Sequence, residues 1–432
     1  MKPMTRAKIE TAQLLSLNAL LRAILPRSRF YAKQLARRGV VHRFKSLTDF
    51  RTRVPFTTKT ELVADQAAHP PFGTNRTFPL DRYTRFHQTS GTTGQPLRWL
   101  DTRDSWDWMV NNWVTVFRMA GVRRGDRIFF AFSFGPFIGF WLAFDAAQKL
   151  DCLCIPAGGM SSAARLRAIL DNGATILCCT PTYALRLAEV AREEKISLDR
   201  SRVRTIIVAG ESGGSIPAVR SRISRAWNDA RIFDHSGMTE VGPVTYEINI
   251  PSPRSRGEGQ GEGRVALAVL ESSYIAEIIG PKSMREVADG EVGELVLTPL
   301  GRTGMPLLRY RTGDLVKKTI IGGQLCLDGG ILGRADDMVI VRGVNLFPSA
   351  IEDVVRRFPE VAEYRVEIRQ KGALAEAKLK IEPVARCRDS DRLAQRLESA
   401  LRSAFNLRIP VAILAPGKLP RFEMKAKRWV KS

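Results

Sequence analysis

The sequence predicts an α/β protein, with a large N-terminal domain built on mostly parallel sheets and a small α+β domain at the C-terminus. Strand-length apolar runs alternate with helix-like patterns between residues 128 and 210. That order is typical of a parallel sheet covered by helices on both faces. The chain has 432 residues, of which 44% are hydrophobic, and this is enough for more than one core. A change of pattern near Gly333 places the two domains at 1–332 and 333–432.

Hydrophobic spacing predicts the individual elements. The first 40 residues carry a broad apolar stripe and are expected to be helical. Further along we expect helices between predicted strands at 128–132, 152–156, 175–179 and 203–209, and shorter strands at 294–298 and 324–327. In the small domain we expect a helix at 349–357, strands at 364–369 and 377–381, and a helix at 389–405.

One segment has a different composition. Residues 251–263 are rich in Pro, Ser and Gly and contain no apolar side chain to bury. We therefore expect a mobile surface loop there.

Composition argues against several classes of protein. Lys and Arg outnumber Asp and Glu by 67 to 44, a net charge of +23, which attracts polyanions. The basic residues are spread along the chain without a nucleic-acid-binding module, so no specific nucleic acid is expected as a partner. No run of about 18 apolar residues and no secretory signal is present, so we expect a cytoplasmic protein without a membrane span. The six cysteines lack metal-site spacing and are expected to be reduced core residues.

Several segments combine glycines with polar side chains. Thr89–Pro96 packs hydroxyls and glycines into one turn that suits phosphate oxygens, although it lacks the lysine of the nucleotide triphosphatase loop. Ala209–Gly214 follows an apolar strand, where a sharp turn can present backbone groups to a flat heterocycle. Asp234–Glu240 and Tyr310–Leu315 place carboxylates beside glycines and hydroxyls. Each segment alone could also be an ordinary turn or a helix start.

Taken in order, and with Gly333–Glu352 and Leu419–Arg428, these segments resemble the motifs of adenylate-forming enzymes. The run Val344–Glu352 resembles the phenylacetate-CoA ligase family in particular. The resemblance covers nearly the whole chain and implies an ATP-dependent carboxylate:CoA ligase that acts through an acyl-adenylate. An aryl or other apolar carboxylic acid is the expected substrate, and ATP, Mg²⁺ and CoA are the expected cofactors. A mobile C-terminal domain and a homodimer are further expectations.

The resemblance also implies a nucleotide site. A mobile phosphate loop would contain Ser90, Gly91, Thr92, Thr93 and Gly94, and the adenine pocket would contain Gly210, Glu211 and Ser212. Asp234, His235, Ser236 and Gly237 would complete the nucleotide site. Thr239 would contact the α-phosphate, and Glu240 would help to hold Mg²⁺, which prefers oxygen ligands. Asp314 would accept hydrogen bonds from the ribose hydroxyls, and Arg334 would contact ribose or phosphate.

The same resemblance implies a moving lid. Asp336 would be the hinge of the small domain, and Gly343 would line the path of the pantetheine arm of CoA, where a side chain would obstruct. Lys425 would be the adenylation lysine, which places a cation where charge develops in the transition state.

Aromatic residues between 129 and 144 have two readings. Aromatic side chains dominate protein cores, so core packing is the first. The run also occupies the region where relatives build the wall of the acyl pocket, and its candidates for that role are Phe134, Phe137, Phe140 and Trp141.

Two departures from the family pattern qualify these expectations. Ser236 stands where relatives carry the tyrosine that stacks on adenine, and His235 is the candidate for a flat face in its place. Ile248 and the loop at 251–263 stand where relatives carry a cysteine and a histidine, so no structural zinc is expected.

Two alternatives remain open on the sequence. The acyl group could pass to a carrier protein or an amine instead of CoA. A protein of another class, an inactive nucleotide-binding protein, is also compatible with Ser236 and with the altered loop.

Overall fold

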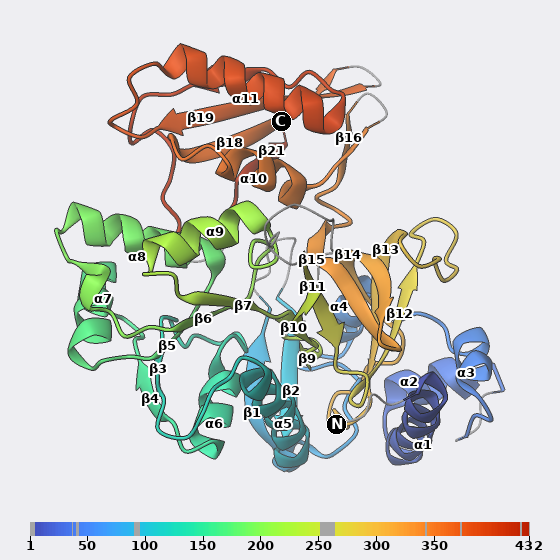
Figure 1. The fold of residues 1–432 in the computed structure, drawn as a ribbon. Helices are drawn as coiled ribbons and strands as arrows, with labels where there is room; N and C mark the ends of the chain where they lie inside the picture. Colours follow the sequence, from blue (N-terminus) through green and yellow to red (C-terminus); the bar gives the residue numbers. More distant parts are fainter. Residues whose placement is uncertain are drawn as a thin grey trace. The chain divides into compact units, whose positions relative to one another are not determined.

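The computed structural model describes residues 5–36, 38–39, 43–89, 96–250, 264–341, 344–371, 374–423 and 426–431. The chain divides into two compact units (Figure 1). The first contains Met1–Gly159 and Asp234–Gly330, and the second contains Met160–Phe233 and Ile331–Ser432. The expected phosphate loop, the Pro/Ser/Gly-rich segment 251–263, Gly343 and Lys425 lie outside the described residues.

The N-terminal helices of the first unit pack on one of its sheets. They are α1 (Arg6–Ile24) and α2 (Arg29–Ala36), which lie in the first 40 residues as predicted, and α3 (Leu47–Arg53), which was not predicted. Leu17, Tyr31 and Phe50 are fully buried in a cluster that also includes Ile275 and Leu308. The next helix, α4 (Lys59–Ala68), starts at a capping box in which Thr58 and Glu61 satisfy each other's backbone N–H groups.

A short hairpin and two helices follow. Strands β1 (Tyr83–Gln88) and β2 (Arg98–Thr102) pair antiparallel, after the 3₁₀ turn Leu80–Arg82. Helix α5 (Arg103–Met119) is capped by Thr102, and α6 (Trp141–Lys149) packs beside it (Figure 1). Strands β3 (Arg127–Phe130) and β4 (Leu153–Pro156) pair in parallel, as their apolar runs predicted.

The remainder of the first unit is a strongly twisted antiparallel sheet with the strand order β10-β11-β15-β14-β13-β12. The strands are β10 (Thr245–Ile250), β11 (Arg264–Val269), β12 (Tyr274–Ile279), β13 (Val292–Pro299), β14 (Tyr310–Ile321) and β15 (Gln324–Arg334). A short ribbon of β8 (Gly237–Met238) and β9 (Gly242–Pro243) precedes it. The sequence pattern located strands in this region but did not resolve their antiparallel pairing. The tight turn at Gly322 and Gly323, both at positive φ, permits that pairing because antiparallel neighbours need only a two-residue connection.

In the second unit, residues 160–233 continue the predicted alternation of helix and strand. The helices are α7 (Ser162–Asp171), α8 (Pro181–Glu193) and α9 (Pro217–Ala226), and a 3₁₀ turn lies at Leu198–Arg200. Strands β5 (Ile176–Cys179) and β6 (Thr205–Val208) pair in parallel, and β7 (Arg231–Asp234) follows β6 in the sheet order. Every side chain of β5 and β6 is buried, which explains why both strands are continuous apolar runs.

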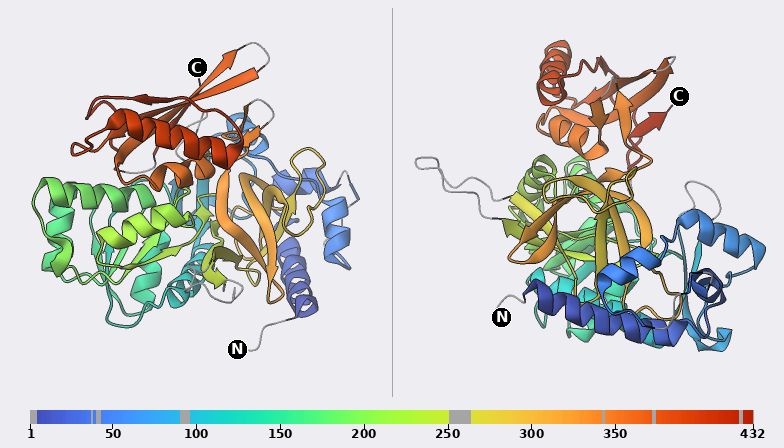
Figure 2. Two further views of the ribbon diagram at one scale, coloured as in Figure 1. Left: turned by 45° about the horizontal axis from the view of Figure 1, so that its top comes forward. Right: turned by 90° about the vertical axis from the view of Figure 1, so that its right-hand side faces the viewer.

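Residues 339–431 form the α+β part of the second unit. Its sheet has the order β17-β16-β19-β18-β21, with β20 beside β19. The strands are β16 (Val339–Val341), β17 (Val344–Leu346), β18 (Val361–Lys371), β19 (Leu374–Pro383), β20 (Val411–Ile413) and β21 (Trp429–Lys431). Helices α10 (Pro348–Arg356) and α11 (Ser390–Phe405) lie on one face of this sheet (Figure 2). The helices and the long strands agree with the predicted elements.

The α/β fold class is therefore confirmed, whereas the domain limits at 332 and 333 stay a prediction. The six cysteines all lie in the described part of the chain, where none forms a disulfide, and four of them are buried. No helix in the described part of the chain is both long and apolar enough to cross a membrane.

The core of the C-terminal part gives a test of packing. Leu397 on α11 is completely buried among the side chains of β18 and β19. We expect Leu397→Ala to lower the free energy of unfolding by about 2–5 kcal/mol, because a large cavity remains. Urea unfolding followed by circular dichroism measures this change. Gln395→Ala, at an exposed position of the same helix, is the control, and equal stability of the two variants would contradict the placement of α11.

Candidate active site

The segment that contains Asp234–Glu240 is fixed by strand β10. The backbone N–H of Asp234 donates to Glu247 Oε2 at 2.8 Å. Ser236 donates its N–H to Thr245 Oγ1 at 2.8 Å, and the two hydroxyls lie 3.0 Å apart. The hydroxyl that replaces the family's tyrosine is thus paired with β10. A Cβ added at Gly237 would lie 2.7 Å from the carbonyl oxygen of Gly242, so the β8–β9 ribbon requires glycine there.

A buried ion pair positions Thr239. Arg302 and Asp101 are both completely buried and form two parallel hydrogen bonds, of 2.7 and 2.6 Å. The remaining Nη1 of Arg302 donates to the backbone oxygen of Thr239 at 2.7 Å. A bidentate guanidinium holds its partners in a fixed plane. The backbone of the predicted phosphate-binding residue is therefore rigidly placed by a pair that sequence analysis did not identify.

The carboxylate of Glu240 faces cationic and donor groups. Glu240 is only 6% exposed. Its Oε1 lies 3.4 Å from Lys59 Nζ and accepts a hydrogen bond from Tyr310 Oη at 3.4 Å. Carboxylate oxygens are the ligands that Mg²⁺ prefers, so Glu240 has the chemistry expected of a Mg²⁺ ligand. Sequence analysis missed Lys59 because its only local signal is a helix start.

Asp314 lies in an irregularity between β13 and β14. The register shifts between Glu294 and Val296, so the residues before Leu315 lose their regular partners. Gly313 takes a φ of +76° and donates its N–H to Glu294 Oε1 at 3.1 Å. The N–H of Asp314 donates to Thr312 Oγ1 at 3.0 Å. Bulges of this kind redirect a side chain away from the regular face of a strand, and Asp314 is half-buried.

The acyl-pocket candidates form one aromatic cluster. The ring centroids of Phe134 and Trp141 are 4.8 Å apart, and Phe132 joins Phe137 at 5.1 Å and Phe140 at 5.6 Å. Phe140 is buried, whereas the other three candidates are half-buried. The cluster satisfies the core-packing interpretation, and a pocket-lining role stays a prediction.

Trp113 on α5 connects this cluster to His235. Its ring centroid lies 6.1 Å from that of Phe140 and 4.2 Å from that of His235, and the planes of Trp113 and His235 meet at 68°. His235 is 5% exposed, and neither ring nitrogen makes a hydrogen bond. Burial lowers the pKa of His235 to about 4, so the ring is neutral at pH 7. This buried position favours a core role over the stacking role expected in place of the family's tyrosine.

In the second unit, the turn at 210–212 follows strand β6. Gly210 takes a φ of +94°, which turns the chain sharply after the strand. Glu211 is half-buried, and both of its carboxylate oxygens accept backbone N–H groups, from Thr182 at 2.8 Å and from Ala426 at 2.9 Å. Ser212 is also half-buried. The sharp turn after the strand is as expected, the Glu211 side chain bonds within the protein, and a role of this turn in binding adenine stays a prediction.

Arg334 and Asp336 lie where strand β15 ends. Arg334 is the last residue of the strand, and its carbonyl oxygen accepts from Asp337 and Met338 at 3.0 Å each. Asp336 is exposed in this turn. An exposed turn between two strands suits a hinge, and the hinge role stays a prediction.

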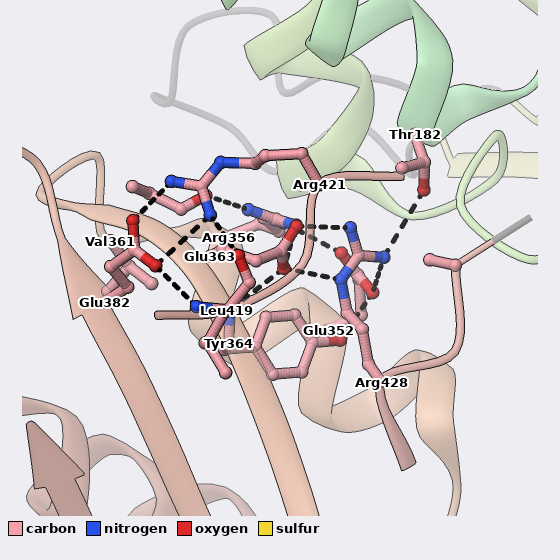
Figure 3. A network of polar contacts seen from close by, with 12 residues as sticks. Thr182, Glu352, Arg356, Val361, Glu363, Tyr364, Glu382, Leu419, Arg421 and Arg428 are labelled. Carbon is pink, nitrogen blue, oxygen red and sulfur yellow. Dashed lines mark hydrogen bonds and ion pairs between the residues drawn. The ribbon is translucent and has the colours of Figure 1, made fainter. Parts of the chain in front are cut away.

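A buried ionic network supports the C-terminal segment (Figure 3). Arg428 is 7% exposed and donates to Glu363 at 2.7 and 3.2 Å and to Glu352 at 3.4 Å. Arg356 donates to Glu352 at 2.8 Å, and the Tyr364 hydroxyl donates to the same carboxylate. Nearby, Arg421 pairs with Glu382. Buried charges persist only when paired, so this network holds the residues on both sides of 424–425.

Comparison with known proteins identifies the class of this protein. A family model described as AMP-binding enzyme matches residues 59–301, and one described as AMP-binding enzyme C-terminal domain matches 343–432. These two models define the chain as an adenylate-forming enzyme.

Individual relatives narrow the class. Phenylacetate-coenzyme A ligase of Thermus thermophilus is 30% identical over 98% of this chain and 96% of its own. The solved structure of 2-hydroxyisobutyryl-CoA ligase in the postadenylation state with 2-HIB-AMP is 28% identical, with a TM-score of 0.90 over all of this chain and 91% of that one. The same ligase with 2-HIB-AMP and CoA in the thioesterification state is 29% identical, with a TM-score of 0.71 over the same shares. The chain belongs to the phenylacetate-CoA ligase family, and it is an AMP-forming acid–thiol ligase.

His235 provides a test of the first unit. The pKa of His235 is about 6.5 in the unfolded chain and about 4 in the folded protein. The unfolded chain therefore takes up a proton first, and the free energy of unfolding decreases as the pH falls from 6.5 to 4. We expect His235→Phe to reduce this loss and to leave stability at pH 7 unchanged or higher, because no hydrogen bond is removed. Urea unfolding at pH 7 and pH 5 measures both effects. His69→Phe, at an exposed histidine, is the control, and an unchanged pH dependence in His235→Phe would contradict a buried neutral imidazole.

Glu352 provides a test of the network in the second unit. Burial opposes its charge, but Arg428 and Arg356 outweigh this and lower its pKa to about 2 from 4.5. The carboxylate therefore stabilises the fold above pH 4.5, and this contribution disappears as the pH falls toward 2. We expect Glu352→Gln to lower the free energy of unfolding at pH 7 by about 3–5 kcal/mol and to flatten its decline in acid. Exposed Asp391→Asn is the control for urea titrations at both pH values, and parallel acid profiles for wild type and Glu352→Gln would refute the assignment.

Proposed function

We propose that this protein activates an aryl or other apolar carboxylic acid with ATP and transfers the acyl group to the thiol of CoA. In the first step a carboxylate oxygen attacks the α-phosphorus of ATP, the bond to the bridging oxygen breaks, and acyl-adenylate and pyrophosphate form. In the second step the CoA sulfur attacks the acyl carbon, the thiol proton is lost and AMP leaves. The observation that carries the proposal is the family relationship across the whole chain, with Asp314, Thr239 and Glu240 at their motif positions.

The first unit supplies groups for the nucleotide. Asp314, redirected by the bulge at Gly313, offers two acceptor oxygens to the ribose hydroxyls. Thr239 is held by Arg302 and offers its hydroxyl to the α-phosphate. Glu240 offers a buried carboxylate to Mg²⁺, which supplies charge neutralisation to the phosphates when bound.

Arg334 and Lys425 are the cations proposed for the phosphate and carboxylate oxygens. Lys425 would stabilise the charge that develops in the first step, because a positioned cation acts more strongly in the transition state than in the ground state. Rotation about Asp336 would then replace Lys425 by the loop that contains Gly343 for the thiol step. Such alternation separates the two half-reactions in time.

The apolar substrate is supported by the aromatic cluster. Phe134, Phe137 and Trp141 are half-buried, and the ring contacts that they make in the described part of the chain are with other aromatic side chains. Aromatic rings of a substrate pack well against such edges and faces. An acid whose side chain is a small aryl or branched apolar group fits this environment better than an acid whose side chain is charged.

Lys425→Ala tests the first half-reaction. We expect acid-dependent release of pyrophosphate from Mg-ATP to fall about 10²–10³-fold, the effect of removing one positioned electrostatic group. The measurement uses a panel of aryl, arylacetic, short branched and fatty acids, with and without CoA. The neighbouring exposed Lys427→Ala is the matched control.

The panel also separates the possible acceptors. Formation of an acyl-CoA thioester establishes the ligase. If acyl-adenylate forms without a thioester, and is consumed when an acyl-carrier protein or an amine is added, that molecule is the acceptor instead of CoA. Equal activity of Lys425→Ala and Lys427→Ala would reject the role proposed for Lys425.

A further inference from the structure

The chain on both sides of Lys425 contacts residues 162–211 of the same unit. Glu423 Oε1 accepts from the Ser162 hydroxyl at 3.2 Å, and Ala426 N–H donates to Glu211 Oε2 at 2.9 Å. Arg428 Nη1 donates to Thr182 Oγ1 at 3.3 Å. Thus three residues that lie within three positions of Lys425 in the sequence each form a hydrogen bond with a side chain of residues 162–211.

Glu211 is the centre of this set. Its Oε1 accepts the N–H of Thr182, the second residue of α8, and its Oε2 accepts the N–H of Ala426. The first N–H groups of a helix have no partner within the helix, and the helix dipole favours a negative charge at that end. The carboxylate is therefore well suited to the α8 terminus, and it holds the residue that directly follows Lys425 through a charge-assisted bond.

Thr182 joins Glu211 to the buried ionic network. Its N–H is bonded to Glu211, while its hydroxyl accepts from Arg428 (Figure 3). Arg428 is in turn held by Glu363 and Glu352. Arg428 is therefore bonded directly to the first turn of α8, and Ala426 is joined to the same turn through Glu211.

We propose that Glu211 is a positioning residue for the adenylation half-reaction, which acts by holding the backbone at Ala426 and so the placement of Lys425. This inference rests on the proposed function. If the small domain turns about Asp336 for the thiol step, the Glu211–Ala426 and Thr182–Arg428 bonds break, and Glu211 then supports the first half-reaction only. Each of its oxygens already accepts a backbone N–H, and this favours a role through Lys425 over a direct contact with the adenine.

The test measures the two half-reactions separately. Acid-dependent pyrophosphate release reports adenylation, and the reaction of supplied acyl-adenylate with CoA reports thioester formation. The variants are Glu211→Gln, which replaces one acceptor oxygen by a donor, and Ala426→Pro, which removes the N–H. The matched control is Glu194→Gln, because Glu194 lies at the C-terminal end of α8 and forms an exposed ion pair with Arg167.

We expect both variants to lower the turnover of adenylation about 10- to 100-fold, the usual effect of losing a hydrogen bond to a charged group. The KM for ATP should change much less, and the ratio of adenylation to thioester formation should fall by nearly the whole factor. The double variant should be no slower than the slower single variant, because both remove the same bond. Hydrogen exchange of the peptide that covers 419–431 should quicken in Glu211→Gln and not in Glu194→Gln.

Other outcomes overturn the inference. A rise in the KM for ATP, with weaker use of acyl-adenylate, would make Glu211 a nucleotide ligand. An equal loss in both half-reactions would make it structural only. If Ala426→Pro does not fold, Thr182→Val and its conservative partner Thr182→Ser take its place, with a fall in adenylation expected for the first and recovery for the second. A wild-type protein that releases no pyrophosphate with any acid overturns the proposed function, and this inference with it.

Discussion

Each unit of this protein depends on the rule that a charge removed from water must be compensated. In the first unit the completely buried Arg302 and Asp101 satisfy each other, and the one remaining guanidinium nitrogen fixes the backbone of Thr239. In the second unit Arg428, Arg356, Glu352 and Glu363 form a closed set of opposite charges. Such pairs add little net stability compared with apolar packing, but breaking them is costly. They specify one arrangement of the polypeptide, and that is what a site for a charged nucleotide requires.

The sequence predicted the elements better than their connections. The parallel strands at 128–132, 152–156, 175–179 and 203–209 and the helices of the C-terminal part could be located because each has a clear hydrophobic period. The antiparallel sheet of β10 to β15 could not be resolved, because pairing is set by turns and cross-strand contacts that spacing alone does not contain. Asp314, Thr239 and Glu240 could be proposed as site residues because their neighbours in the chain are distinctive, and their roles stay predictions.

The partners of those residues were not predictable in the same way. Arg302 lies 201 residues from Asp101, and Glu211 lies 215 residues from Ala426. Nothing in the local sequence of either residue reveals these contacts, since arginine and glutamate are common throughout a chain with 67 basic and 44 acidic residues. The environment of His235 was not predictable either. Its position in a motif made it a candidate for a flat face beside adenine, but the local sequence does not reveal that its ring packs against Trp113 and is buried.

The bulge before Asp314 makes the proposed ribose site depend on side chains that would not touch the ribose. The ladder between β13 and β14 is interrupted there, and the backbone N–H groups of Gly313 and Asp314 donate to Glu294 and to Thr312. Side chains thus take over part of the work that strand pairing does elsewhere in the sheet. A substitution at Glu294 or Thr312 can therefore misplace Asp314 while leaving its carboxylate in the sequence.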